Sequence, residues 1–179
     1  VTVALNTELA EPNIAYILSD CDVKIFITTQ GFQRKINALL SDITSIVFIW
    51  KSKGKAVEAD EVENLIPDAY GSFPENRPAI RLIDLDIASI VYTSGSTGQP
   101  RGATLSHLNI VTNTRSIVEY LELTKDDRIM VVMPFYYIYG KSLLNTHFFV
   151  GGSVVVDNRF MFPNVILKTM VEQKVTGFS

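Results

Sequence analysis

The chain has 179 residues, which is enough for one domain with a sizeable hydrophobic core. Hydrophobic residues make up 47% and charged residues 20%, as in a soluble globular protein, and the net charge of −3 argues against a nucleic-acid-binding surface. The single cysteine, Cys21, excludes an intrachain disulfide framework, and no apolar run reaches the length of a membrane span. Val1–Leu5 lacks the charged start and cleavage site of a signal peptide, so we expect a cytoplasmic protein.

The first part of the chain alternates short β-branched runs with amphipathic stretches. We predict strands at Val1–Leu5, Val23–Thr28 and Ser45–Trp50. We also predict two helices, one that begins at Pro12 and one that spans Gly31–Leu40. Proline in a first helical turn costs no hydrogen bond. The continuous apolar run of the second strand predicts burial on both of its faces. Strands joined by a helix form a βαβ unit, which implies a parallel sheet.

The segment Lys51–Pro78 differs from its surroundings because it holds a lysine-rich start, an acidic run and few large apolar residues. We predict one short helix in it, at Asp60–Leu65. This composition is consistent with two interpretations. The segment is either a solvated excursion that links two subdomains or a long surface loop within one domain.

Regular alternation returns after this segment. An apolar strand, Ile87–Tyr92, is followed by a loop rich in glycine and hydroxyl residues, Thr93–Gly98. Ser106 is predicted to cap a helix that ends near Leu121, with buried positions at Leu108, Val111, Ile117 and Val118. The remaining predicted elements are a short strand at Ala103–Leu105, a strand at Arg128–Met133, an aromatic turn at Pro134–Gly140, a helix at Lys141–Val150, a strand at Ser153–Val156, a helix at Phe162–Lys174 and a strand beginning at Val175. The fold class is therefore α/β, with parallel-sheet layers flanked by helices.

The segment Tyr92–Gly102 has the composition of an anion-binding loop. Its glycines let the backbone turn several N–H groups toward one point, and Arg101 adds a planar fork that suits phosphate oxygens. Hydroxyl donors come from Thr93, Ser94, Ser96 and Thr97. The loop follows the carboxyl end of a predicted buried strand, which is where open α/β sheets bind ligands.

Three other interpretations of this loop are weaker. A flexible linker would not sit between a buried strand and a capped helix. A Walker A loop requires G-x-x-x-x-G-K-[ST], but Gly95 and Gly98 are too close together and no Lys-Ser/Thr pair follows. A dinucleotide-binding G-x-G-x-x-G pattern does not fit glycines at 95, 98 and 102.

At every motif position, Tyr92–Gly102 resembles the signature loop of the adenylate-forming enzymes, which include acyl-CoA and aryl-CoA synthetases, firefly luciferase and peptide-synthetase adenylation domains. Leu105–Asn109 is similar to the segment that follows the loop in many acyl-CoA ligases. Leu5–Asn6, Ile14–Leu18 and Asp86–Ala88 are also similar to segments of these enzymes, so the resemblance covers nearly the whole chain.

The resemblance implies a set of residues that bind ATP and pyrophosphate. Family members more often carry lysine at the position of Arg101, and arginine keeps the charge but not the point-donor geometry. The implied set is Thr93, Ser94, Gly95, Ser96, Thr97, Gly98 and Arg101.

A second candidate site is the aromatic segment Met133–Gly140. Acyl-CoA ligases usually have P-L-F-H-x-x-G here, near the acyl pocket, and Tyr137 stands at the histidine position. The resemblance makes Tyr137, Tyr139 and Gly140 acyl-pocket candidates, while a core aromatic cluster is the alternative. The peptide-synthetase branch has an aspartate after the phenylalanine, and its absence favours ligases that use CoA or a carrier protein.

The implied reaction has two steps: a carboxylic acid and ATP form an acyl-adenylate and pyrophosphate, and a thiol then displaces AMP. The implied ligands are ATP, Mg²⁺, a carboxylic acid and a thiol acceptor, which is CoA or an acyl carrier protein. The resemblance also implies a role in fatty acid metabolism. The family's adenine, ribose and catalytic-lysine motifs fall outside Val1–Ser179, so we expect no catalytic residue and no metal ligand here.

We therefore expect residues 1–179 to be a fragment of the family's large N-terminal domain, with both apolar ends cut from a longer chain. Such a fragment should be inactive alone and should self-associate through unpaired sheet edges. The two histidines, His107 and His147, are expected to be structural. A non-catalytic nucleotide-binding or regulatory module is the alternative function, and the intact loop argues against a purely structural fragment.

Overall fold

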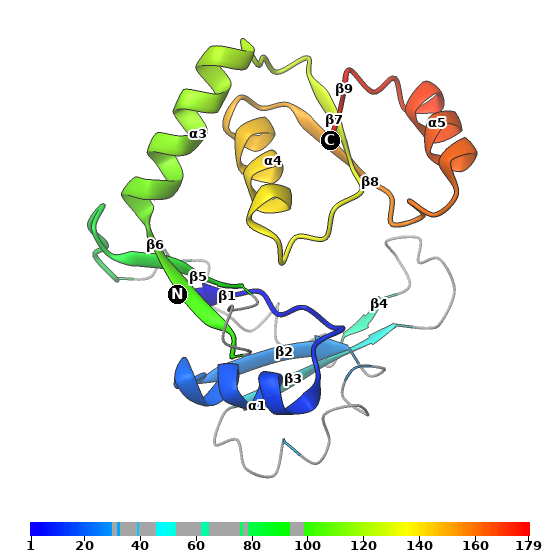
Figure 1. Cartoon of the computed structure of the whole chain (residues 1–179). Coiled ribbons are helices and arrows are strands. Elements are labelled where there is room, and N and C mark those ends of the chain that lie inside the picture. The colour runs from blue at the N-terminus through cyan, green and yellow to red at the C-terminus, as the bar shows by residue number, and fades with distance from the viewer. Residues whose placement is uncertain are drawn as a thin grey trace. The chain divides into compact units, whose positions relative to one another are not determined.

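The computed structural model describes residues 1–29, 46–52, 62–64, 79–93 and 99–179, together with the single residues Phe32, Leu39 and Asn76. The chain divides into two compact units (Figure 1). The first unit consists of residues 6–81 and 94–100, and the second consists of residues 1–5, 82–93 and 101–179. No helix in the described parts combines the length and the apolar character needed to cross a membrane.

The first unit contains helix α1, Glu11–Asp20, and the strands β2, Ile25–Thr29, β3, Ile46–Ser52, and β4, Val62–Asn64. Strands β2 and β3 pair in parallel, as the predicted βαβ unit requires, and β4 pairs antiparallel with β3. The strand β4 lies where a short helix was predicted, so that prediction is wrong for these three residues. Most of Lys51–Pro78 lies outside the described residues.

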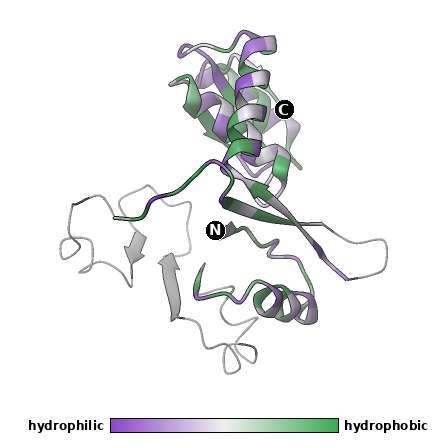
Figure 2. Ribbon diagram, turned by 90° about the vertical axis from the view of Figure 1, so that its left-hand side faces the viewer, coloured by the Kyte–Doolittle hydropathy of each residue, from purple (hydrophilic) through white to green (hydrophobic). Residues whose placement is uncertain are grey.

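Helix α1 begins beside Pro12, as predicted, and buries one face. Its apolar residues Ile14, Ile17 and Leu18 are buried and follow the spacing of one helical face. In Figure 2, hydrophilic and hydrophobic residues alternate along this helix. The helix ends where the Cys21 N–H donates to the carbonyl of Ile17.

Strand β2 is buried on one face only, which corrects the prediction of burial on both faces. Phe26 and Thr28 are buried, whereas Ile25 and Ile27 are 55% and 65% exposed. Successive side chains of a strand point to opposite faces, so an apolar run does not by itself require two covered faces. Of the predicted helix at Gly31–Leu40, the structure describes only Phe32 and Leu39, both with helical backbone.

The second unit contains a three-stranded sheet of β1, Thr2–Val3, β5, Ile87–Thr93, and β6, Arg101–Ser106. The strand order is β1-β5-β6, so β5 is an inner strand, as predicted. Strand β1 is parallel to β5, and β6 is antiparallel to it. The pairing of β5 with β6 as a hairpin was not predicted, and β6 is longer at both ends than the strand expected at Ala103–Leu105.

Helix α3, His107–Leu121, starts at the predicted cap. The Asn109 N–H donates to Ser106 Oγ at 3.2 Å, and the Ser106 N–H donates to Asn109 Oδ1 at 3.0 Å. The predicted burial of Leu108 and Val111 is wrong, because their side chains are 45% and 39% exposed. The helix buries a narrow stripe against α4, centred on Thr114 and including the partly buried Ile117 and Val118.

A second sheet in this unit has the order β8-β7-β9 and is entirely parallel. Its strands are β7, Arg128–Val131, β8, Ser153–Val156, and β9, Gly177–Phe178. Helix α4, Ile138–Phe149, connects β7 to β8, and helix α5, Pro163–Glu172, connects β8 to β9. Because the two connections run in opposite directions along the sheet, right-handed crossovers place α4 and α5 on opposite faces (Figure 1).

The core of this sheet lies between β7 and α5. Met130, Val132 and Ile166 are buried together, and the partly buried side chains of Val155, Met170 and Val175 pack against them. Helix α4 packs against β7 and β8, and its other side contacts α3. This arrangement fixes the start of α4 relative to the carboxyl end of β7.

Candidate functional site

The predicted phosphate-binding loop is the connection of the β5–β6 hairpin. Thr93 is the last residue of β5 and Arg101 is the first residue of β6, and the two are paired directly across the ladder. They were expected within the loop itself and instead lie at its two ends. The expected loop residues Ser94, Gly95, Ser96, Thr97 and Gly98 lie outside the described residues.

The side chains of Thr93 and Arg101 share one face of the sheet. Directly opposite residues of an antiparallel pair project to the same side, and residues two apart along a strand do so as well. Ser89 and Val91, which are buried, therefore share this face with Thr93. Thr93 and Arg101 are both exposed, so a hydroxyl and a guanidinium flank the loop on one side.

On the opposite face of the hairpin, neighbouring side chains leave no room for a side chain at Gly102, the last residue of the motif. Gly102 pairs with Tyr92, and a Cβ at Gly102 would lie 2.9 Å from Ile90 Cγ2 and 3.0 Å from Tyr92 Cζ. The tyrosine ring therefore stands over the glycine backbone, as aromatic residues often do opposite a glycine in a sheet. Tyr92 and Gly102 are thus a cross-strand pair in which the tyrosine ring packs on the glycine, one position before the loop.

Arg101 supplies a positive charge at the base of the loop. None of the ion pairs found in the described part of the chain involves Arg101. Five N–H donors in a rigid fork suit phosphate oxygens, and an adjacent threonine hydroxyl can donate to the same anion. This donor set fits a phosphate or pyrophosphate group.

The second candidate region follows the carboxyl end of β7. The sheet order β8-β7-β9 places the reversal of strand order between β7 and β9, and ligands of open α/β sheets bind beside such a point. The chain leaves β7 there, turns at Pro134 and enters α4. The Tyr137 N–H donates to the Pro134 carbonyl at 3.1 Å, and Tyr137 is the residue that precedes α4.

The three acyl-pocket candidates have different surroundings. Tyr137 and Tyr139 are 47% and 52% exposed, so they do not form part of a buried aromatic core. The Tyr137 ring lies against the Tyr136 ring, with centroids 4.6 Å apart. Gly140 is buried in the first turn of α4, and a Cβ there would lie 2.8 Å from the Pro134 carbonyl oxygen. Gly140 thus permits close packing of the helix on the turn.

Helix α4 begins at Ile138, three residues before the predicted start. The Lys141 N–H donates to the Tyr137 carbonyl at 3.2 Å, which closes the first helical turn around Gly140. The sequence did not predict this first helical turn, because aromatic residues and glycine are weak helix formers. Two predicted site residues, Tyr139 and Gly140, are therefore helical.

Lys141 was missed by sequence reasoning. Its Nζ donates to Ser89 Oγ at 3.0 Å, so α4 contacts the strand that leads into the loop. Burial lowers the pKa of the Lys141 ammonium group. The signal in the sequence is a lysine within a largely apolar helix, but nothing local indicates its partner 52 residues away.

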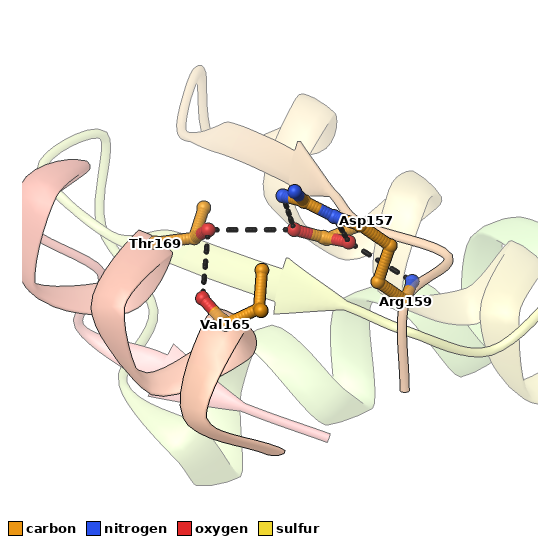
Figure 3. Close-up of polar contacts among 4 residues, drawn as sticks. All are labelled: Asp157, Arg159, Val165 and Thr169. Atoms are coloured by element: carbon orange, nitrogen blue, oxygen red, sulfur yellow. Dashed lines mark hydrogen bonds and ion pairs between the residues drawn. The ribbon is translucent and has the colours of Figure 1, made fainter. Parts of the chain in front are cut away.

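A buried carboxylate at the carboxyl end of β8 was also missed (Figure 3). Asp157 is 6% exposed and accepts hydrogen bonds from the Arg159 backbone N–H and Nε, both at 2.9 Å. Thr169 Oγ1 of α5 donates to the same carboxylate at 3.4 Å. These hydrogen bonds, foremost the one from the Arg159 side chain, lower the pKa of Asp157 to about 2. The cluster fixes the β8–α5 connection.

The two histidines have different surroundings. His147 is 4% exposed, and its Nδ1 lies 2.9 Å from the Leu143 carbonyl oxygen one turn earlier in α4. The His107 backbone N–H donates to the Asp86 carbonyl at the start of α3. Across the described residues, no group of three or more histidine, cysteine, aspartate or glutamate side chains is placed to hold a metal ion.

Known proteins resemble the chain along its whole length. The family described as AMP-binding enzyme matches residues 1–179. An indoleacetate–CoA ligase of Aromatoleum aromaticum is 30% identical over 175 residues, covering 96% of this chain and 33% of the relative. The crystal structure of ATP-bound MatB from Rhodopseudomonas palustris has a TM-score of 0.78 at 28% identity, covering 96% of this chain and 32% of that chain.

A further solved structure, the anthranilate CoA ligase AuaEII in complex with anthranoyl-AMP, has a TM-score of 0.79 at 26% identity and covers 99% of this chain and 34% of that chain. The fold is thus that of the N-terminal domain of acyl-CoA ligases. The chain spans about a third of the length of the curated relatives it matches. Because the family match includes every described element of both units, the chain belongs to the AMP-binding enzyme family, whose members include CoA ligases and synthetases.

Proposed function

We propose that this chain is the part of an ATP-dependent, adenylate-forming carboxylate ligase that binds the pyrophosphate leaving group. The observation that carries the proposal is the hairpin that pairs Thr93 with Arg101 at the two ends of a loop rich in glycine and hydroxyl groups. Membership of the AMP-binding enzyme family supports the reaction class. The proposed binding residues are Thr93, Ser94, Gly95, Ser96, Thr97, Gly98 and Arg101.

In the first proposed step, a carboxylate oxygen of the substrate attacks the α-phosphorus of ATP. The bond from that phosphorus to the bridging oxygen breaks, and pyrophosphate leaves with the bonding electron pair. Negative charge grows on the leaving group, and in this proposal the Arg101 guanidinium and the hydroxyl and N–H groups of the loop stabilise it. This chain's contribution is therefore to position the phosphates and to stabilise the charge that develops.

In the second proposed step, a thiolate attacks the acyl carbon of the adenylate, AMP leaves, and the proton of the thiol passes to solvent or base. CoA is the favoured acceptor, because relatives are named as CoA ligases, and a carrier protein is the second possibility. Mg²⁺ would be held mainly by phosphate oxygens, as is usual where ATP is bound, and would neutralise phosphate charge. Loop hydroxyls are the protein groups best suited to lie near it.

Tyr137, Tyr139 and Gly140 are proposed to line the end of the acyl pocket. Support comes from the position of this turn at the carboxyl end of β7, beside the reversal of strand order. The half-exposed tyrosine rings provide apolar faces with one hydroxyl each. A carboxylic acid with an apolar or aromatic body is the substrate class that suits such a wall.

The proposal assigns residues 1–179 to the N-terminal domain of a longer, cytoplasmic enzyme, with 51–78 as a link or excursion. Activity would then require adenine, ribose and catalytic-lysine groups from the rest of that enzyme. A regulatory module that binds nucleotide without chemistry is the competing proposal, and it predicts ATP binding without pyrophosphate exchange.

Substitution of the loop in the longer enzyme tests the proposal. Replacing Thr97 by Phe or Gly98 by Leu should block the approach of backbone N–H groups to phosphate and reduce carboxylate-dependent ATP–pyrophosphate exchange on the order of 100-fold. Thr112→Phe, at an exposed position of α3, is the matched control and should leave exchange unchanged. Equal exchange rates in the loop variants and the control would refute the assignment of the loop.

A further inference from the structure

We propose that Lys141 is a positioning residue that couples the phosphate-loop hairpin to the aromatic turn of the acyl pocket. The inference rests on the proposed function, because those two regions hold the nucleotide and the acid. Its contact with Ser89 joins α4 to β5 within one unit of the chain. Neither Lys141 nor Ser89 belongs to the loop motif Tyr92–Gly102.

Lys141 lies in the first turns of α4, directly after the aromatic turn. Lys141 lies one helical turn after Tyr137, and its N–H donates to the Tyr137 carbonyl at 3.2 Å. A movement of the Lys141 side chain therefore acts on the first turn of α4, which contains Tyr139 and is packed on Pro134 through Gly140.

Ser89, the partner of Lys141, lies on the strand that leads into the loop. Ser89 and Thr93 lie on one face of β5, and four residues of strand span about 13 Å at roughly 3.3 Å per residue. Ser89 Oγ accepts from Lys141 and donates to the Thr2 carbonyl at 3.0 Å, so the hydroxyl joins three elements. Thr2 Oγ1 in turn donates to the Ala88 carbonyl.

The ladder is irregular at the point where Lys141 binds. The register of β5 against β6 shifts between Ile87 and Ser89, which is the mark of a β-bulge. Bulges redirect a strand and its side chains, and they occur often beside functional sites. The lysine contact therefore holds the strand immediately after its register changes and before it enters the loop.

The charge of Lys141 is costly at this position. None of the salt bridges found among the described residues involves it, and burial lowers its pKa. Lys141 is only partly buried, and an ammonium group that is partly withdrawn from water without a carboxylate partner loses hydration that an apolar side chain of the same size would not lose. Leucine or methionine would fill the same space, so the hydrogen bond to Ser89 is the feature that only the amine provides.

The expected consequence is a loss of turnover more than of binding. If Lys141 sets the position of the acid relative to the phosphates, its removal leaves each binding region intact but misplaces the reacting atoms. A misplacement of about 1 Å can reduce a rate about 100-fold. A residue needed only for folding would instead lower the amount of active enzyme and the melting temperature.

The test uses the longer enzyme with Lys141→Met, Ser89→Ala and the double variant. Methionine keeps the length of the side chain and removes the ammonium group. We expect kcat for acid-dependent ATP–pyrophosphate exchange to fall about 10- to 100-fold in each variant, with KM for ATP changed less than about threefold. The double variant should lose no more activity than Ser89→Ala alone, because Lys141→Met removes only a contact that Ser89→Ala has already broken.

Lys168→Met is the matched control, because Lys168 is an exposed lysine of α5. It should keep the wild-type kcat and KM. Wild-type kcat in Lys141→Met, or a loss explained by unfolding of the variant at the assay temperature, would overturn the positioning role while leaving the proposed function standing. Absence of acid-dependent exchange in the wild type would overturn both.

Discussion

Thr93 and Arg101 face each other as the last residue pair of the β5–β6 ladder, with their side chains on the same face of the sheet. Side chains opposite each other in an antiparallel pair have Cβ atoms about 4.5–5.5 Å apart, which is close enough for both to contact one phosphate. The hairpin thus fixes a hydroxyl and a guanidinium at the two ends of the loop, independently of the loop residues between them.

Replacement of Arg101 should separate the effects of charge and geometry. Arg101→Ala removes the cation beside the leaving pyrophosphate and should lower kcat/KM for ATP in the exchange reaction on the order of 100-fold. Arg101→Lys keeps the charge and should retain most of the rate, since lysine also binds phosphate as a point charge. Arg115→Ala, at an exposed position of α3, serves as the control. An unaltered rate in Arg101→Ala would show that the guanidinium has no role.

Two glycines should respond differently to alanine. At Gly140 the new Cβ would lie 2.8 Å from the Pro134 carbonyl oxygen, and backbone cannot move without shifting the turn or α4. At Gly102 the new Cβ would meet the Ile90 and Tyr92 side chains, which can rotate. Gly140→Ala should destabilise the fold by about 1–3 kcal/mol, and Gly102→Ala by less. Chemical denaturation of both variants measures the difference, and the reverse order would contradict the packing described here.

The stability contributed by Asp157 should depend on acid pH. Its pKa is lowered from 3.8 to about 2 in the folded chain, so folding favours the ionised carboxylate. The contribution is therefore complete above about pH 4 and is lost as the pH falls toward about 2. Asp157→Asn should cost about 1–3 kcal/mol of unfolding free energy at pH 7, and the difference from wild type should shrink below pH 4.

Urea unfolding between pH 7 and pH 3 measures this difference. Asp126→Asn, at an exposed position before β7, is the control and should show no such convergence. A difference between Asp157→Asn and wild type that stays constant down to pH 3 would mean that Arg159 and Thr169 do not stabilise the charged carboxylate.

The chain of residues 1–179 on its own should be inactive and should associate with itself. Phe160, Met161 and Phe162 are 60%, 84% and 62% exposed, and β9 is at an edge of its sheet. Exposed apolar side chains and unpaired strand edges favour association. Sedimentation at tens of micromolar should show oligomers, and no acid-dependent pyrophosphate release should be detected. A clean monomer, or measurable release, would contradict the respective half of this prediction.

Much of the fold followed from local patterns in the sequence. The capping residue Ser106, the apolar run of β5 and the proline at the start of α1 each mark an element whose cause is local. The fold class, with its parallel strands and flanking helices, is confirmed. The phosphate-binding role of the loop also rests on a local pattern, a short run of glycine, hydroxyl and basic residues, and it stays a prediction.

What the sequence did not show depends on contacts between distant residues. The sequence predicts only the central part of β6, Ala103–Leu105, and its pairing with β5 extends the strand at both ends. The exposure of Leu108 reflects how narrow the contact between α3 and α4 is, which the helix pattern cannot reveal. The contact of Lys141 with Ser89 joins residues 52 apart and leaves no local trace.

The measurement that tests the central claim most directly is isotope exchange between pyrophosphate and ATP by the longer enzyme, assayed with and without a panel of aliphatic and aromatic carboxylic acids. Adenylate formation makes exchange depend on the acid and yields AMP when a thiol is added. We predict exchange with at least one acid, no exchange without acid, and AMP as the nucleotide product. Release of ADP and phosphate, or exchange that does not depend on any carboxylic acid, would contradict the assignment.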